Sequence, residues 1–524
     1  MDFAPSRRAW LLASLTPLFA LAIFRPWVRE AFPVWDYPQV LPILQANPGV
    51  WDGAMAIAEW NRPDGRANYL SYLQFSFTWG LVGGESVGWQ IARALVMLAV
   101  GVLIIQVARR LGATPIASAV AACVFLVAVP STEGWLLLAG EQLATLLLLL
   151  AVLAAAGYTT TPAWRVRGLL IALLCAGVML AKEVLGLLLP MVVLLALCWD
   201  PARGFRRPAF GPRERWLVAL LLLVLVLEAW SVRSAMQDAV AGNYASAFGR
   251  DGFDRSRALT LFQAMLLPAR FSSASAATTL YPANFAFLLL LLLGLIWPAG
   301  KEPRTRGGGW WALGLLWYPV VGALAYTLWP RYTAYYGIPF FAGSAGLLAL
   351  AASRIERRNP LGGGLLVAGL GTVVVFFAAI ASARTVRQKH ATAALAAAVS
   401  RAWLAAPRLD TLLVVTPPQG GRRWPLSARE LRNYAVFLGA TDSALPLMLD
   451  ASCDEVIRRL QRPLNRSGVL NDQNPCGRIP QQTVTWEKAV GYLDWASLRR
   501  VADTLRVDLL APSWPPSAKR TDPL

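Results

Sequence analysis

The chain has 524 residues, of which 56% are hydrophobic and only 15% are charged, and its formal net charge is +19. Soluble domains are about half apolar and about a quarter charged, so this composition excludes an ordinary soluble protein. His390 is the single histidine, which excludes a metal site built from several histidines.

Long apolar stretches recur over the first 383 residues. A helix needs roughly 20 apolar residues to cross a bilayer. We therefore predict an α-helical polytopic membrane protein with about 11 transmembrane helices, near 9–28, 88–108, 113–130, 141–158, 168–181, 184–199, 216–233, 281–299, 310–329, 332–352 and 361–383.

Two stretches near the start need separate treatment. The first apolar run follows Arg7 and Arg8, as in a signal peptide, but no convincing cleavage site follows, so we expect a retained span. The stretch 69–83 is apolar but short, and we expect it to lie in the membrane interface or to enter the membrane partway.

The basic residues fall in alternate short connections between the apolar stretches, which ties the positive charge to the membrane and not to nucleic acid. By the positive-inside rule these connections face the cytoplasm of a cell inner membrane, together with the N-terminus. The residues concerned are Arg7, Arg8, Arg109, Arg110, Arg165, Arg167, Arg203, Arg206, Arg207, Arg213, Arg215, Lys301, Arg304, Arg306, Arg354, Arg357 and Arg358.

This orientation places three long segments outside the cytoplasm: the loops 29–68 and 234–280, and the C-terminal part 384–524. In the last of these, "LDTLLVVTPP" predicts a strand, and "SARELRNYAVFLGA" and "SLRRVADTLRV" predict helices. We expect a transmembrane domain over 1–383 and a small extracytoplasmic α/β domain over 384–524. Cys453 and Cys476 could pair in that domain.

Ionisable residues in the apolar stretches share one position: all lie at or near the predicted outer ends. They are Arg25, Arg93, Glu141, Lys182, Glu183, Glu228, Arg233 and Arg331. Such residues are costly in a membrane and indicate a functional site. Acids can activate a hydroxyl group, and lysine and arginine can hold phosphate oxygens. The pattern favours group transfer from a lipid phosphate carrier at the outer face.

Four segments carry a family resemblance. They are "VWDYPQVLPILQANPGVWDGAMAIAEWNRPDGRANYLSYLQF" continuing into "GLVGGESVGWQIARALVMLAVGVLIIQVARRLGA", then "GEQLATLLLLLAVLAA", "AKEVLGLLLPMVVLLALCWD" and "RYTAYYGIPFFAGSAGLLAL". In order and spacing they resemble the polyprenyl-phosphate-sugar-dependent membrane glycosyltransferases of the GT-C fold, such as protein mannosyltransferases and aminoarabinose lipid A transferases.

The resemblance implies a hexosyl- or pentosyltransferase that moves a sugar from a polyprenyl-phosphate carrier to a cell-envelope glycan, lipid or protein. Reaction would be a single displacement that inverts the anomeric carbon. Asp36 would activate the acceptor, and Lys182 or Arg331 would contact the carrier phosphate. Many relatives have paired acids in this loop, whereas Trp35 and Tyr37 flank Asp36. This departure weakens the case for a divalent cation, which stays an open cofactor.

Each assignment has a plainer alternative. Asp36 could be a solvated loop acid or a helix cap, and Asp52 is the second candidate for the activating acid. Glu141 could be favoured by its position at a helix N-terminus. Lys182 and Glu183 could pair with each other at the surface.

The roles of two arginines and the function of the whole protein also have alternative interpretations. Arg331 could extend toward outer lipid headgroups, and Arg270 is a lesser candidate for a phosphate contact. A transporter or flippase of lipid-linked saccharides is the main functional alternative, and a non-catalytic scaffold is a third. A transporter would instead place charges near the middle of the membrane.

Overall fold

The structure is a computed structural model that describes residues 6–24, 37–66, 68–136, 138–200, 204–205, 211–237, 252–269, 281–296, 308–328, 334–404, 411–415, 447–450, 496–501 and 504–509. Several sequence predictions lie outside these residues: Asp36, Arg270, Arg331, the helix expected over 427–440 and the cysteines 453 and 476.

The chain divides into two compact units. The first comprises Met1–Val28 and Asn47–Ala383, and the second comprises Arg29–Ala46 and Arg384–Leu524.

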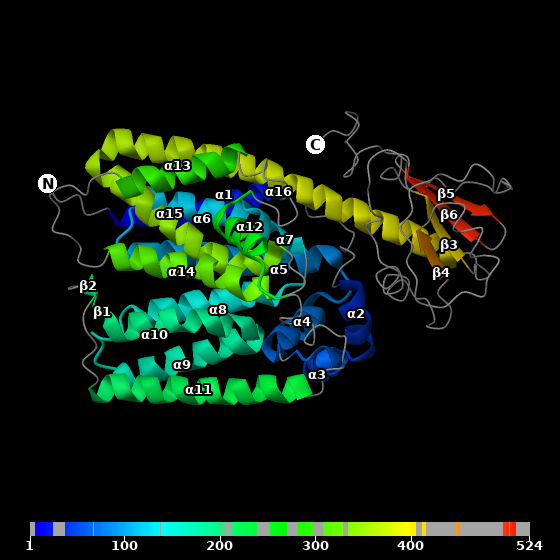
Figure 1. The fold of residues 1–524 in the computed structure, drawn as a ribbon, viewed down its shortest axis with the longest axis horizontal. Coiled ribbons are helices and arrows are strands. Elements are labelled where there is room, and N and C mark those ends of the chain that lie inside the picture. Colours follow the sequence, from blue (N-terminus) through cyan, green and yellow to red (C-terminus); the bar gives the residue numbers. More distant parts are fainter. Residues whose placement is uncertain are drawn as a thin grey trace. The chain divides into compact units, whose positions relative to one another are not determined.

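The described part of the first unit is almost entirely helical (Figure 1). Its α-helices are α1 (Arg7–Phe24), α3 (Val50–Asn61), α4 (Tyr69–Val82), α5 (Ser86–Arg110), α6 (Pro115–Val127), α7 (Val129–Leu136), α8 (Gly140–Ala155), α9 (Trp164–Ala181), α10 (Leu189–Cys198), α11 (Pro212–Gln237), α12 (Arg255–Leu266), α13 (Pro282–Ile296), α14 (Gly308–Thr327), α15 (Ile338–Arg358) and the first part of α16 (Pro360–Leu404). Shorter elements are the 3₁₀ turns η2 (Arg62–Asp64), η3 (Glu183–Leu188) and η6 (Ala334–Gly337), and an antiparallel pair of strands, β1 (Trp199–Asp200) and β2 (Gly204–Phe205).

A helix covers most of each of the eleven predicted apolar stretches. Among the described residues, five helices are long and apolar enough to cross a membrane, and five more apolar helices are shorter. The mostly helical, multi-pass character is therefore confirmed, whereas the count of eleven spans stays a prediction.

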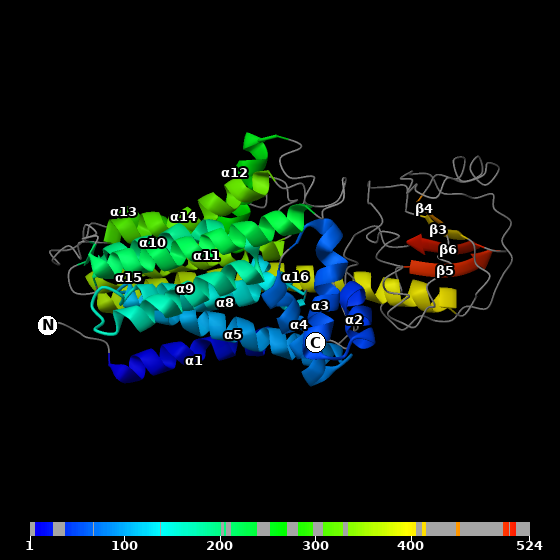
Figure 2. The same ribbon diagram turned by 90° about the horizontal axis from the view of Figure 1, so that it is seen from below.

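The helices of the first unit run roughly side by side (Figures 1 and 2). α15 lies at the centre and contacts α5, α6, α8, α13 and α14. In the helical stretch Ala334–Arg358, 83% of the most apolar 18 consecutive residues are buried, whereas in Pro212–Gln237 the buried share is 17%. α11 is therefore an outer helix, whose leucines at 222, 223 and 227 are exposed where lipid would cover them.

Basic residues gather at one end of the bundle, which we call the basic end: the end of α5, the start of α9, the start of α11 and the end of α15. The guanidinium carbon of Arg109 lies 5.3 Å from the ring centre of Trp10 in the first turns of α1. Arg167 donates to the carbonyl of Gly157, 2.8 Å away, and the Tyr158 hydroxyl donates to the carbonyl of Arg213 at 2.7 Å. Connections far apart in sequence thus meet here, while α3 and α4 lie at the opposite end (Figures 1 and 2).

The second unit contains α2 (Tyr37–Ala46), the end of α16 and a four-stranded sheet. Its strands are β3 (Thr411–Val415), β4 (Leu447–Asp450), β5 (Ala496–Val501) and β6 (Thr504–Leu509), in the order β4-β3-β6-β5. β3 is parallel to β4 and β6, and β5 is antiparallel to β6. The predicted strand at 411–415 is present, whereas the α/β character of 384–524 stays a prediction.

The helix predicted from "SLRRVADTLRV" is wrong, because β5 and β6 occupy this stretch and pair with Val501 opposite Thr504. The sequence contains the reason. Leu505, Val507 and Leu509 alternate with polar residues, which is the period of a strand.

Gly343 marks the closest approach of α14 and α15. A Cβ atom at this position would lie 2.6 Å from the Cβ of Tyr318 and 2.7 Å from the carbonyl oxygen of Leu315. Gly343→Ala is therefore expected to lower the free energy of unfolding by about 1–3 kcal/mol through overpacking. The thermal unfolding midpoint in detergent measures this. Gly369→Ala in α16, where nothing lies within 4 Å, is the matched control, and an equal midpoint for both variants would contradict the packing.

Candidate functional site

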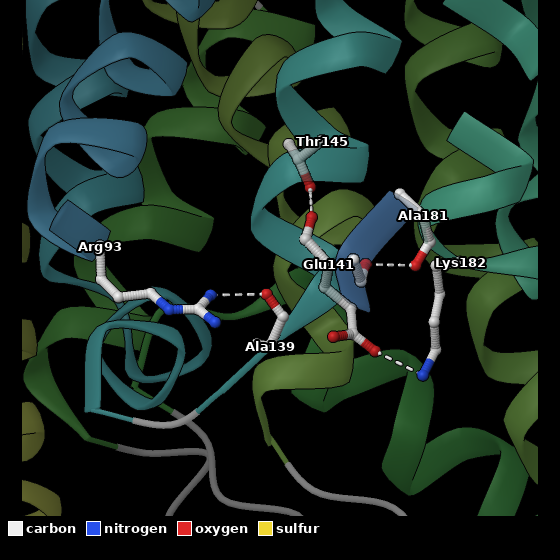
Figure 3. Close-up of polar contacts among 7 residues, drawn as sticks. Arg93, Ala139, Glu141, Thr145, Ala181 and Lys182 are labelled. Atoms are coloured by element: carbon white, nitrogen blue, oxygen red, sulfur yellow. Dashed lines mark hydrogen bonds and ion pairs between the residues drawn. The ribbon is translucent and has the colours of Figure 1, made fainter. Parts of the chain in front are cut away.

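Lys182 and Glu141 form an ion pair at the end of the bundle opposite the basic end. The Lys182 ammonium nitrogen lies 3.0 Å from a carboxylate oxygen of Glu141 (Figure 3). The Lys182 side chain is 13% exposed and that of Glu141 is 1% exposed. Burial opposes the charge of Lys182, but its pKa is raised because the Glu141 carboxylate outweighs that effect. Lys182 therefore carries its charge at neutral pH.

Local backbone structure brings this pair together. α9 ends at Ala181, and Lys182 adopts an extended conformation that turns its side chain away from the helix. Glu141 lies in the first turn of α8, where the helix N-terminus favours a carboxylate. The Ser71 hydroxyl of α4 donates to the Ala181 carbonyl at 2.7 Å. Only glycine fits at position 140, because a Cβ atom there would collide with Ser71 and lie 2.9 Å from that carbonyl.

Arg93 of α5 fixes the start of α8 from the other side. It is 3% exposed and donates to the Ala139 carbonyl at 2.7 Å (Figure 3). It also donates to the Gln142 side-chain oxygen at 2.7 Å. Its guanidinium also lies 5.2 Å from the ring centre of Phe75 in α4. These contacts make Arg93 a positioning residue that fixes the start of α8, and with it Glu141, through Ala139 and Gln142.

Tyr336 supplies an aromatic face to Lys182. The ammonium nitrogen lies 4.9 Å from the centre of the Tyr336 ring, within range of a cation–π contact. Tyr336 lies in η6, and the backbone N–H of neighbouring Tyr335 donates to the Glu133 carboxylate of α7 at 3.3 Å. A buried acid of α7 thus holds the turn that presents Tyr336.

Three more polar residues surround Lys182. Arg66 and Glu183 both act electrostatically on Lys182 and on Tyr72 of α4. Burial, and then the Glu183 carboxylate, raise the pKa of Tyr72 well above its usual value, so this phenol keeps its proton. We call Arg66, Tyr72, Glu141, Lys182, Glu183 and Tyr336 the Lys182 cluster. It combines two cations, two carboxylates and two phenols in a largely buried place.

The structure brings together three of the predicted site residues, Glu141, Lys182 and Glu183. Lys182 makes its ion pair with Glu141 from another helix, not with its neighbour Glu183. Asp52 lies exposed in the first turn of α3, and Arg233 is exposed on α11. Asp36, Arg270 and Arg331 are outside the described residues, so their roles stay predictions.

Several residues of this site were not identified from the sequence, namely Ser71, Tyr72, Tyr336, Arg66, Glu133 and Gln142. Glu133 had a usable signal, because it is an acid in the otherwise apolar segment before "GEQLATL". Ser71 and the tyrosines had none, since such residues are common near membrane interfaces.

The donor set does not resemble a metal centre. Within the described parts of the chain, no three His, Cys, Asp or Glu side chains come close enough to hold a metal ion. The divalent cation considered from the sequence thus has no ligand set among these residues.

Apolar helices long enough to cross a bilayer, with a buried cluster of mixed charge at one end of the bundle, define a multi-pass membrane protein with a buried polar site. No family model matches the sequence. No curated protein matches it either.

Solved structures show the fold. The crystal structure of ArnT from Cupriavidus metallidurans bound to undecaprenyl phosphate is similar, with a TM-score of 0.50 and 13% identity, over 86% of this chain and 88% of that one. The apo structure of the same protein matches with a TM-score of 0.46, 13% identity and 89% coverage of both chains. The expected GT-C-like fold is therefore confirmed, on the strength of the first comparison.

Proposed function

We propose that this protein is a membrane glycosyltransferase that transfers a hexose or pentose from a polyprenyl-phosphate carrier to a cell-envelope glycan, lipid or protein. The observation that carries the proposal is the Lys182 cluster, a buried group of cations and acids at one end of a helical membrane bundle. The fold supports it, because the similar ArnT structure has undecaprenyl phosphate bound.

Lys182 suits a carrier phosphate, with Arg66 as a second cation near it. The Glu141 carboxylate keeps Lys182 charged before substrate binds, and Tyr336 limits the directions in which its ammonium group can point. Arg331 and Arg270 are further candidates for phosphate contacts from their places in the sequence.

Transfer would proceed by a single displacement. Asp36 would accept the proton of an acceptor hydroxyl, whose oxygen forms a bond to the anomeric carbon from the side opposite the phosphate. The bond between that carbon and the phosphate oxygen breaks, the anomeric configuration inverts, and polyprenyl phosphate leaves. Lys182 would stabilise the negative charge that develops on the leaving phosphate.

The orientation follows from the charges. Positive residues favour the cytoplasmic side, so the basic end would face the cytoplasm of the inner membrane and the Lys182 cluster would face outward. The N-terminus would be cytoplasmic and 384–524 would lie outside. The flippase alternative has less support, because the described charged residues of the helices gather toward the two ends.

Mass spectrometry of cell-envelope glycans, lipids and proteins from cells with and without the gene tests this function. Loss of one sugar from one envelope component, restored by the wild-type gene and not by Asp36→Asn, is the expected result. Unchanged envelope sugars would contradict the proposal.

A further inference from the structure

A pocket of about 570 Å³ opens between α9 and α11, next to the Lys182 cluster. It is lined by Met179 of α9 and by one face of α11, which contributes apolar side chains together with Glu228, Arg233 and Gln237. Its volume falls within the range of sites for small molecules, about 300–1,000 Å³. Because α11 is an outer helix, the pocket is accessible to a molecule that approaches from the bilayer.

Glu228 is an unusual residue in this position. It belongs to the buried stripe of α11 with Leu217, Leu221 and Ala235, and it is 9% exposed. One of its carboxylate oxygens is buried and has no hydrogen-bond partner among the described residues. A buried polar group without a partner is costly, and a leucine would fit the stripe without that cost. A hydrogen-bond donor from a ligand would satisfy this oxygen.

Buried polar atoms without hydrogen-bond partners also occur in the Lys182 cluster. Glu183 acts electrostatically on Glu228 on one side and on Tyr72 on the other. The Tyr72 hydroxyl and one Glu183 oxygen are also buried without a partner among the described residues, and Tyr72 is 4% exposed. Glu228 is the unsatisfied acid that lines the pocket, and Glu183 links it electrostatically to Tyr72 and Lys182 of the Lys182 cluster.

The charges of these residues select the chemistry of the ligand. Two carboxylates and a protonated phenol offer acceptors and one hydroxyl, which suits a head group rich in hydroxyl donors. The carboxylates disfavour a phosphate or a carboxylate beside Glu228, and the one cation among the described lining residues, Arg233, is exposed. The cations Lys182 and Arg66 belong to the Lys182 cluster and do not line the pocket, so a phosphate fits at the cluster instead.

We infer that the pocket holds the polyhydroxylated sugar of the lipid-linked donor. Glu228, the acid that lines the pocket, binds its hydroxyl groups, and its phosphate lies at Lys182. This inference rests on the proposed function and adds the orientation of the donor and a preference for sugars without negative charge. Glu228 is then a specificity-determining residue.

Binding of two kinds of carrier to the purified full-length protein tests the inference by native mass spectrometry. One is bare undecaprenyl phosphate, and the other is undecaprenyl phosphate carrying glucose, mannose or arabinose. Glu228→Leu is expected to weaken binding of the best glycosylated carrier by about tenfold or more, since it removes the hydrogen bonds between the sugar hydroxyls and the Glu228 carboxyl group. Its affinity for the bare carrier should change less than about twofold, because that carrier has no sugar to contact Glu228.

Glu228→Gln keeps one acceptor oxygen in the same volume and is expected to show an intermediate loss. The bare carrier serves as the control for folding. If both variants kept the wild-type ratio of the two affinities, the inference would be overturned while the proposed function stood. If the wild-type protein bound neither carrier, the proposed function itself would fail.

Discussion

Asp36→Asn is expected to lower the rate of sugar transfer by about 10²–10⁴-fold, because an amide cannot accept the proton of the acceptor hydroxyl. Donor binding and the thermal unfolding midpoint should stay at wild-type values, since Asn has nearly the same size. Transfer of labelled sugar by purified protein, measured at saturating donor, checks the rate.

Asp64→Asn is the matched control for this prediction. Asp64 is the last residue of the turn η2 and precedes Gly65, whose φ of +69° favours glycine. Aspartate is common in such turns, so its position is explained by the turn and not by catalysis. Asp52→Asn tests the competing assignment, since Asp52 is the other acid of this region. Full activity of Asp36→Asn together with loss of activity in Asp52→Asn would show that the roles are reversed.

Glu141→Leu is expected to lower the free energy of unfolding by about 3–5 kcal/mol, because it leaves the mostly buried Lys182 ammonium without its partner. The double variant Glu141→Leu/Lys182→Met should recover most of that stability, since it removes both charges. A double-mutant cycle on unfolding midpoints in detergent measures the coupling.

Measuring transfer activity distinguishes the structural role of the ion pair from the proposed phosphate-binding role of Lys182. The double variant should stay inactive although it is stable, because it lacks the cation proposed to bind the carrier phosphate. Additive effects of the two single substitutions on stability would contradict the ion pair. Recovery of activity in the double variant would contradict the role of Lys182.

The sequence was sufficient to predict the helical bundle and part of the site. Long apolar stretches indicate membrane-spanning helices directly, and a helix covers most of each of the eleven predicted stretches. Glu141 and Lys182 were recognisable because charged residues next to apolar stretches are rare. Topology then placed the start of α8 and the end of α9 at the same end of the bundle.

The contacts that complete the site have no local signal. The Ser71 hydroxyl reaches the Ala181 carbonyl across 110 residues of sequence, and Arg93 reaches Gln142 across 49. Such pairs depend on how helices pack, which apolar patterns do not specify. The wrong helix prediction for "SLRRVADTLRV" has another cause, since this stretch combines helix-favouring residues with a strand-like alternation of Leu505 and Val507 with polar residues.

The proposed glycosyltransferase must cleave the bond between the sugar and the carrier phosphate. Purified protein in liposomes, supplied with labelled polyprenyl-phosphate sugar and a cell-envelope extract, tests this cleavage most directly. We expect labelled sugar on an envelope component and one bare polyprenyl phosphate released per sugar transferred. Movement of the labelled carrier across the bilayer with its sugar still attached, and no bare carrier released, would contradict the account and favour a flippase.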